Sequence, residues 1–234
     1  MDRISRKELK SDRFQERVGS TVQYLDEHRR PVTLIGSIVL AVLLLGWGAH
    51  WYSGKQKVVR QQALTRALDI QNSAVGPSSG NPLVKTYPTA EARREEAVKA
   101  FQQIINDYSG SEEATIARYY LGVIAAEAGK DTDAAKYLQE VAGSGRNLYS
   151  SLAQFALAQL YQGQGKTAEA EKLLRGLIDH PSILVSKEQA TIALAKVIAP
   201  KNPAEARKLL EPLRTERSAV SRTALTALSE IPAQ

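Results

Sequence analysis

Histidine carries acid–base and metal-binding chemistry near neutral pH more often than any other side chain, and this chain has three histidines. His28 and His50 flank a long apolar segment, and neither has a histidine or cysteine neighbour at the spacing of a helical metal site. His180 follows Asp179, a pair that could act as a base and the carboxylate that orients it. Because His180 ends a predicted helix just before a proline, we expect it to interact with the carbonyls of that helix end instead.

The remaining candidates for chemistry are also weak. Two glycine-bearing stretches, GSGRN (143–147) and GQGK (163–166), are too short for a phosphate loop and predict turns between helices. The absence of cysteine excludes disulfides, thiolate metal sites and thiol nucleophiles. We therefore predict no enzyme activity and no catalytic, cofactor-binding or metal-binding residues, and we expect no cofactor and no small-molecule substrate.

The net charge of +6 lies outside the C-terminal part of the chain. Residues 91–234 carry eighteen basic and eighteen acidic residues, so the excess falls in residues 1–31 and 53–90. A nucleic-acid-binding domain needs a basic face, and residues 91–234 have no charge surplus to form one. We predict that the chain binds no nucleic acid, and phospholipid headgroups explain basic residues beside an apolar segment.

Residues 32–52 form an apolar run of 21 residues without Asp, Glu, Lys or Arg. As a helix this run is roughly 30 Å long, the thickness of a bilayer core. Arg29 and Arg30 precede it, and aromatic side chains typical of a membrane interface close it: Trp47, Trp51 and Tyr52. Core helices seldom run this long without a charge, and a cleaved signal peptide has a shorter apolar region. We predict an uncleaved single-pass transmembrane anchor in the lipid bilayer.

The anchor divides the chain into predicted parts. Residues 1–31 form a charged tail with eight basic residues, which mildly favours a cytoplasmic tail, although the basic counts within 20 residues of each end of the anchor are equal. Residues 53–73 have apolar side chains at helical spacing and predict an amphipathic helix. Residues 74–90 are rich in Pro, Gly and Ser and predict a linker, and residues 91–234 predict a repeat domain.

A period appears from residue 90 onward. Four segments begin with alanine and carry large apolar residues four and seven positions later: AVKAFQQI from Ala97, AAKYLQEV from Ala134, AEKLLRGL from Ala170 and ARKLLEPL from Ala206. The alanines lie 37, 36 and 36 residues apart. Thirteen residues before the last three alanines stand the pairs Leu121–Gly122, Leu157–Ala158 and Ala193–Leu194.

This pattern resembles the tetratricopeptide (TPR) repeat, whose unit of about 34 residues reads W-x₂-L-G-x₂-Y…A-x₃-F. The motif's Trp position holds Arg118, Gln154 and Ala190, so the units are degenerate. An ordinary alanine-rich bundle would not keep the register over four units. We predict an all-α fold, an N-terminal transmembrane helix followed by a TPR-like superhelix of helical hairpins. A C-terminal capping helix over residues 219–230 should turn Leu225 and Leu228 inward.

In TPR proteins the first helix of each unit lines a concave groove that binds a partner. The repeat register places these residues in it: Ile116, Tyr119, Val123, Glu127, Leu152, Phe155, Gln159, Gln162, Glu188 and Thr191, with Ala195 and Ile198 beyond them. Tyr119 and Phe155 are the strongest candidates for contact with a peptide, because aromatic side chains offer a large area at low entropic cost. Packing against neighbouring repeats is an equally good interpretation of these two residues.

The whole layout resembles the bacterial inner-membrane family of TPR-like ancillary subunits of the SecYEG translocon. The resemblance implies a cytoplasmic tail, a periplasmic repeat domain, and a protein–protein interaction adaptor that passes newly translocated proteins to periplasmic chaperones. Its expected partners are translocon subunits, chaperones and client proteins. A structural scaffold for another envelope assembly, in cell division, pilus or outer-membrane biogenesis, is the alternative.

Overall fold

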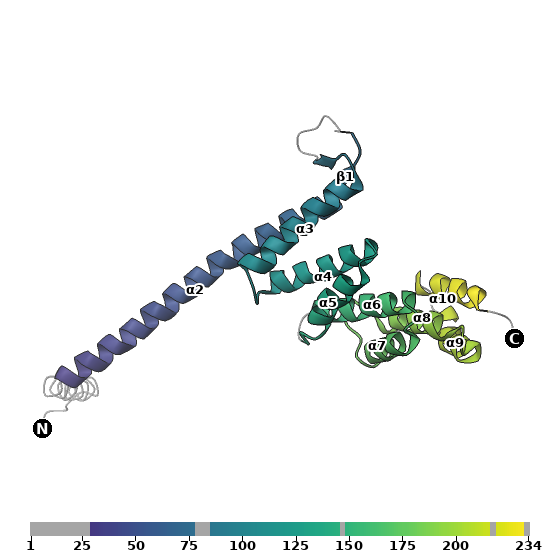
Figure 1. Cartoon of the computed structure of the whole chain (residues 1–234). Coiled ribbons are helices and arrows are strands. Elements are labelled where there is room, and N and C mark those ends of the chain that lie inside the picture. The colour runs from purple at the N-terminus through teal and green to yellow at the C-terminus, as the bar shows by residue number, and fades with distance from the viewer. Residues whose placement is uncertain (1–28, 78–84, 146–147, 216–218, 232–234) are drawn as a thin grey trace, which may run out of the picture. The chain divides into compact units, whose positions relative to one another are not determined.

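The computed structural model describes residues 29–77, 85–145, 148–215 and 219–231 (Figure 1). The chain divides into two compact units, one that ends at Val58 and one that begins at Val59. Residues 1–28, which hold most of the predicted charged tail, lie outside the described residues.

Helix α2, Arg29–Asn72, is the longest element and crosses the boundary between the two units. In the first unit its described large apolar side chains, from Leu34 to Trp47, are exposed, and Trp47 is 72% exposed. Over the residues that the structure describes, none of the helices combines the length and the hydropathy of a membrane span. The predicted anchor also includes residues 48–52, whose side chains lie outside the described part.

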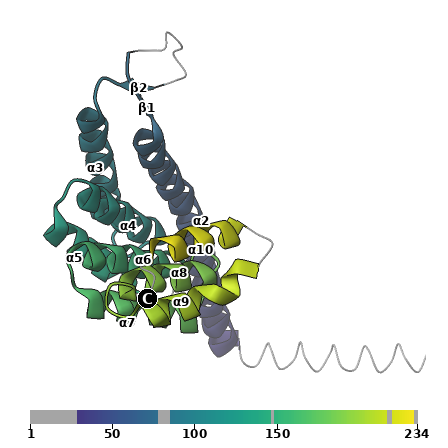
Figure 2. The same ribbon diagram turned by 90° about the vertical axis from the view of Figure 1, so that its right-hand side faces the viewer.

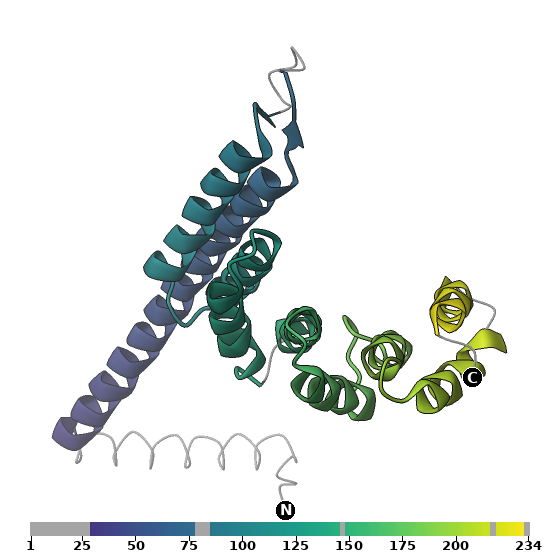
Figure 3. The same cartoon turned by 45° about the vertical axis from the view of Figure 1, so that its right-hand side comes forward.

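The second unit continues with helices and a pair of short strands. The strands β1 (Ala74–Val75) and β2 (Thr86–Tyr87) pair in parallel within the segment predicted as a linker. The helices that follow are α3 Ala90–Asp107, α4 Glu112–Glu127, α5 Asp131–Ala142, α6 Leu148–Gly163, α7 Thr167–Asp179, α8 Lys187–Ile198, α9 Pro203–Leu210, the 3₁₀ helix η1 Glu211–Thr215, and α10 Ala219–Glu230. Successive helices pack against each other as antiparallel pairs (Figure 3).

Local sequence signals set the ends of these helices. The side-chain oxygens of Thr89, Ser111, Ser186 and Asn202 each accept a hydrogen bond from a backbone N–H in the first turn of the helix that follows. Gly129, in the turn between α4 and α5, has a φ of 69°, a left-handed conformation that a glycine adopts without steric cost. The turns between paired helices are therefore encoded locally.

The repeat register predicted from the sequence is confirmed. The four register alanines, Ala97, Ala134, Ala170 and Ala206, are all fully buried. The large apolar residues four positions later, Phe101, Leu138, Leu174 and Leu210, are each at most 1% exposed. Each second helix of a pair thus turns the same face toward the first helix.

Close approach of the two helices in a pair requires a small residue at the crossing. A Cβ atom added to Gly122 of α4 would lie 2.8 Å from Cγ of Leu138 in α5. Leu138 is itself fully buried, so its side chain has little space into which to move. The glycine of the Leu121–Gly122 pair is therefore a packing requirement of the hairpin.

The core of the second unit follows the stack of hairpins. Near its N-terminal end, buried residues of α2, α3 and α4 pack together, among them Ala67, Phe101 and Leu121. Near its C-terminal end, residues of α7 to α10 form another buried cluster. Helix α10 lies against α8 and α9 and closes this end of the stack (Figure 2).

Two expectations about single elements need correction. Of the two predicted inward residues of the capping helix α10, Leu228 is half-buried against the C-terminal core cluster, as predicted, but Leu225 is 49% exposed. Ala224 and Ala227 of α10, and Ile231 after it, are the buried residues. The amphipathic helix predicted at residues 53–73 is the continuation of α2, and its apolar face packs on α3 as the first helix of the first repeat.

Candidate partner-binding groove

A groove opens between α4 and α6, the first helices of two successive hairpins. It has a volume of about 610 Å³. Four of the predicted partner-binding residues line it: Tyr119, Val123 and Glu127 from α4, and Gln159 from α6. Leu138 of α5 also contributes to its wall. The groove therefore combines apolar walls with polar groups at its edge.

An aromatic cluster borders this groove. The rings of Tyr119 and Tyr149 meet edge to face with centroids 5.4 Å apart, and Tyr120 stacks on Phe101 at 5.2 Å. Contacts of this geometry contribute about 0.5–1.5 kcal/mol beyond burial of area. The cluster connects α3, α4 and the start of α6, so Tyr119 both packs against a neighbouring repeat and lines the groove.

Two tyrosines of this cluster, Tyr119 and Tyr149, have raised pKa values. Burial, and after it the charge of Tyr120, raises the pKa of Tyr119. Burial, with smaller contributions from Tyr120, raises the pKa of Tyr149 to about 12. These tyrosines are therefore neutral hydrogen-bonding groups at physiological pH, and they offer a partner rings and hydroxyls without charge.

Other predicted groove residues lie elsewhere. Ile116 is half-buried on α4, and Leu152 and Phe155 are half-buried against the C-terminal core cluster. Gln162 is exposed and lines a separate cavity of about 420 Å³ that residues of α8 and α10 also line. Only some of the residues that the repeat register places on one surface therefore line the groove between α4 and α6.

The third repeat departs furthest from the prediction. Thr191 is only 8% exposed, and its hydroxyl donates a hydrogen bond to the carbonyl of Lys187 at 2.8 Å. Ala195 and Ile198 are also buried, in the cluster that includes the buried face of α10. The pKa of Glu188 is lowered, chiefly by a hydrogen bond from its own backbone N–H and then by Ser186. In the third repeat, α10 therefore covers inner-face positions such as Ala195 and Ile198.

A model of the tetratricopeptide repeat-like domain family matches residues 24–177, more than half of the chain. The chain belongs to this family. Two solved structures share its TPR-like fold, and both are of a putative kinesin light chain with nearly identical TPR-like repeats from Podosopora anserina. One of them, a variant, has 16% identity and a TM-score of 0.55, and the other has 17% and 0.54. Each match covers 73% of this chain and 84% of the other. No curated protein matches the chain significantly.

A TPR-like repeat fold is typical of non-enzymatic scaffolds for protein–protein interaction. Of the three histidines, His28 lies outside the described residues, as does the side chain of His50. His180 is exposed at the end of α7, and within the described residues its side chain forms no hydrogen bond with Asp179 or a serine. No group of three metal-ligating side chains occurs in the part of the chain that the structure describes.

Sequence reasoning missed several residues of the TPR-like groove. Ala126 and Leu160 lie one turn or less from predicted residues on the same helices, so a wider stripe on each helix would have included them. Asp131 is the first residue of α5, and Gly163 is the last residue of α6. No periodic signal marks these two, because they reach the groove only when two hairpins are stacked.

Proposed function

We propose that this protein is a membrane-anchored adaptor that binds other proteins through the groove between α4 and α6. The observation that carries the proposal is the groove itself, whose apolar wall, aromatic border and polar edge lie on the inner helices of successive repeats. A concave site with a few directed polar groups is the usual form of a peptide-binding site on a repeat scaffold.

The binding mode follows from the residues of the groove. Val123 and Leu160 offer apolar surface, and Tyr119 offers a ring held by Tyr149. Gln159 offers an amide donor and acceptor, and Glu127 and Asp131 are the acidic groups of the groove. An extended or helical segment with apolar side chains and a basic residue fits this combination.

The proposed anchor is the apolar segment over residues 32–52. Exposed large apolar side chains from Leu34 to Trp47 support it, because water is a poor environment for so many of them together. In the proposed topology the tail is cytoplasmic and the repeat domain is periplasmic, at the inner membrane of a bacterium.

Within this topology, the proposed role is association with the SecYEG translocon and transfer of translocated proteins to periplasmic chaperones. The support is the order of parts along the chain, a charged tail, an apolar segment and TPR-like repeats. The alternative is a scaffold for an assembly in cell division, pilus or outer-membrane biogenesis. Both roles require the same anchor and groove, and they differ in the identity of the partner.

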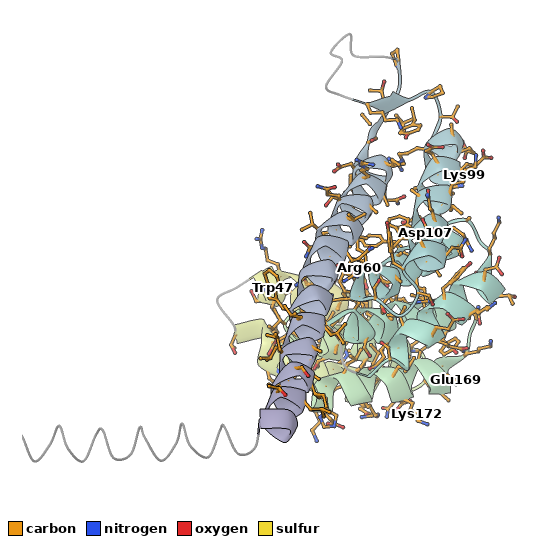
Figure 4. All side chains as sticks on the ribbon, turned by 90° about the vertical axis from the view of Figure 1, so that its left-hand side faces the viewer. Trp47, Arg60, Lys99, Asp107, Glu169 and Lys172 are labelled. Atoms are coloured by element: carbon orange, nitrogen blue, oxygen red, sulfur yellow. The ribbon has the colours of Figure 1, made fainter. Side chains whose placement is uncertain are left out.

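In-cell photocrosslinking tests the groove and separates the two roles. A photoreactive amino acid at Val123 or Gln159 should crosslink to translocon subunits, periplasmic chaperones or secreted clients. The same amino acid at Glu169 or Lys172, exposed on α7 (Figure 4), is the matched control. Crosslinks to division or pilus proteins favour the scaffold. Equal products from α7 and from the groove would refute the groove as the binding surface.

The proposed topology has its own test. A reporter enzyme that is active only in the periplasm, fused after the last residue, should give signal. Activity from a reporter that works only in the cytoplasm, at the same position, would contradict it.

A further inference from the structure

A second groove lies between α2 and α3, at the other end of the stack from α10. It has a volume of about 510 Å³, and all its lining residues come from these two helices and from Tyr108, which follows α3. Its wall includes apolar side chains from both helices: Val59, Ala63 and Ile70 from α2, and Ala100 and Ile104 from α3. No other described helix contributes to it.

The shape of this groove suits a helix. Its lining residues include a row at positions 59, 63, 66 and 70 of α2 and a row at 96, 100, 103 and 107 of α3, so each helix presents side chains at a spacing of three or four. Rows at this spacing are the ridges between which another helix packs. At the C-terminal end of the stack α10 packs on the last hairpin. Repeat arrays need such a cap, and in the described residues the α2–α3 hairpin has none on this groove.

The charges at the groove indicate which helix fits. Arg66 of α2 and Lys99 of α3 both line it, one from each side. Within the described residues neither forms a salt bridge, although other basic residues such as Arg60 and Arg175 do. Two unpaired cations beside an apolar wall attract a carboxylate. Two carboxylates of α3 also line the groove, Glu96 three residues before Lys99 and Asp107 eight residues after it (Figure 4). The partner helix should therefore carry basic residues on either side of its central carboxylate.

We propose that the groove between α2 and α3 is a docking site for one amphipathic helix of a partner protein. The helix lays its apolar stripe on Ala63 and Ala100 and places a carboxylate between Arg66 and Lys99. This site is separate from the groove between α4 and α6.

Fluorescence anisotropy with the purified full chain in detergent tests the proposal. The probes are two hydrocarbon-stapled helical peptides with leucines on one face, one with a central glutamate and one with lysine at the same position. We expect the glutamate peptide to bind about fivefold more tightly. The double variant Arg66→Glu/Lys99→Glu should reverse this preference. A misfolded chain would lose binding of both peptides, so the reversal separates charge recognition from damage to the fold. The variant Lys172→Glu, on exposed α7, should keep the wild-type preference.

Crosslinking locates the bound peptide. A photoreactive amino acid in place of Gln103, which lines the groove, should crosslink to the glutamate peptide. The neighbouring Gln102 is exposed and does not line the groove, so the same replacement there should not. Absence of saturable binding, an unchanged preference in the double variant, or equal crosslinks from the two positions would each overturn the proposal. It would also be overturned if the full chain were a dimer that the double variant dissociates.

Discussion

Nε of Arg60 in α2 lies 3.1 Å from Oε2 of Glu113 in the first turn of α4. The Glu113 side chain is only 8% exposed, and Arg60 is its ion-pair partner across 53 residues of sequence. The pair fixes the last part of α2 to the second hairpin. It is thus one of the contacts that make α2 an integral helix of the repeat stack.

Replacement of Arg60 should destabilise the repeat domain. Arg60→Ala leaves a mostly buried carboxylate without its partner, and because Arg60 keeps some exposure we expect a cost of about 1–2 kcal/mol. Thermal unfolding of the full chain, followed by circular dichroism, measures the change. Arg94→Ala removes the exposed Arg94–Glu91 pair, 3.9 Å apart, and should cost about 0.5 kcal/mol or less. Equal losses in the two variants would show that the Arg60–Glu113 pair does not stabilise the stack.

Two glycines in helices should respond in opposite directions to alanine. Gly122→Ala places a Cβ atom 2.8 Å from Leu138 in a filled core and should destabilise the domain by about 1–2 kcal/mol, after the gain in helix propensity. Gly176→Ala, in α7, meets no atom within 4 Å and should stabilise it by about 0.5–1 kcal/mol. Urea unfolding of both variants gives the comparison. Stabilisation by Gly122→Ala would mean that the α4–α5 crossing has room.

Leucine at two positions of α7 tests the repeat register. Ala170 is 0% exposed, so Ala170→Leu overpacks the hairpin and should cost about 1–3 kcal/mol. Lys172 is exposed two residues later, and Lys172→Leu should cost about 0.5 kcal/mol or less. Helix propensity differs little between the two substitutions, so packing dominates the difference. Identical unfolding midpoints would contradict the register.

The raised pKa of Tyr149 should be detectable in a titration at high pH. The unfolded chain loses the phenolic proton of Tyr149 near pH 10, and the folded chain, whose pKa for Tyr149 is about 12, keeps it longer. The contribution of Tyr149 to stability is therefore complete below pH 10 and is lost as the pH rises toward 12. Ultraviolet titration of Tyr149→Phe should lack the latest phenolate. A late phenolate of unchanged size in this variant would assign it to another tyrosine.

Much of the repeat domain is predictable from the sequence, because its determinants are local. The four alanines from Ala97 to Ala206 hold the same position in successive repeats, and all four are buried. Gly145 and Gly165, both left-handed, lie in the two glycine-bearing stretches predicted as turns. A helical hairpin needs only neighbouring residues of suitable size and period, so periodicity alone identifies its core face.

The pairing of two helices across a long connection is less predictable. The apolar stripe of residues 59–70 was visible in the sequence, but its partner, α3, lies beyond a Pro- and Gly-rich segment. That segment suggested a break between domains. The segment instead joins the two helices of the first hairpin, and its ends pair as β1 and β2.

The sequence by itself determined the helical class, the register of the repeats and the positions of their turns, because each depends on spacing within one or two helices. Only the tertiary structure decided which surfaces stay open. Tyr119 and Gln159 share a groove because two hairpins stack, whereas Ala195 and Ile198 are buried in the core cluster that includes Ala224 and Ala227 of α10. An inner-face position has the same sequence signature whether it meets solvent or a capping helix. Exposure depends on helices that lie far away along the chain, and no local pattern encodes it.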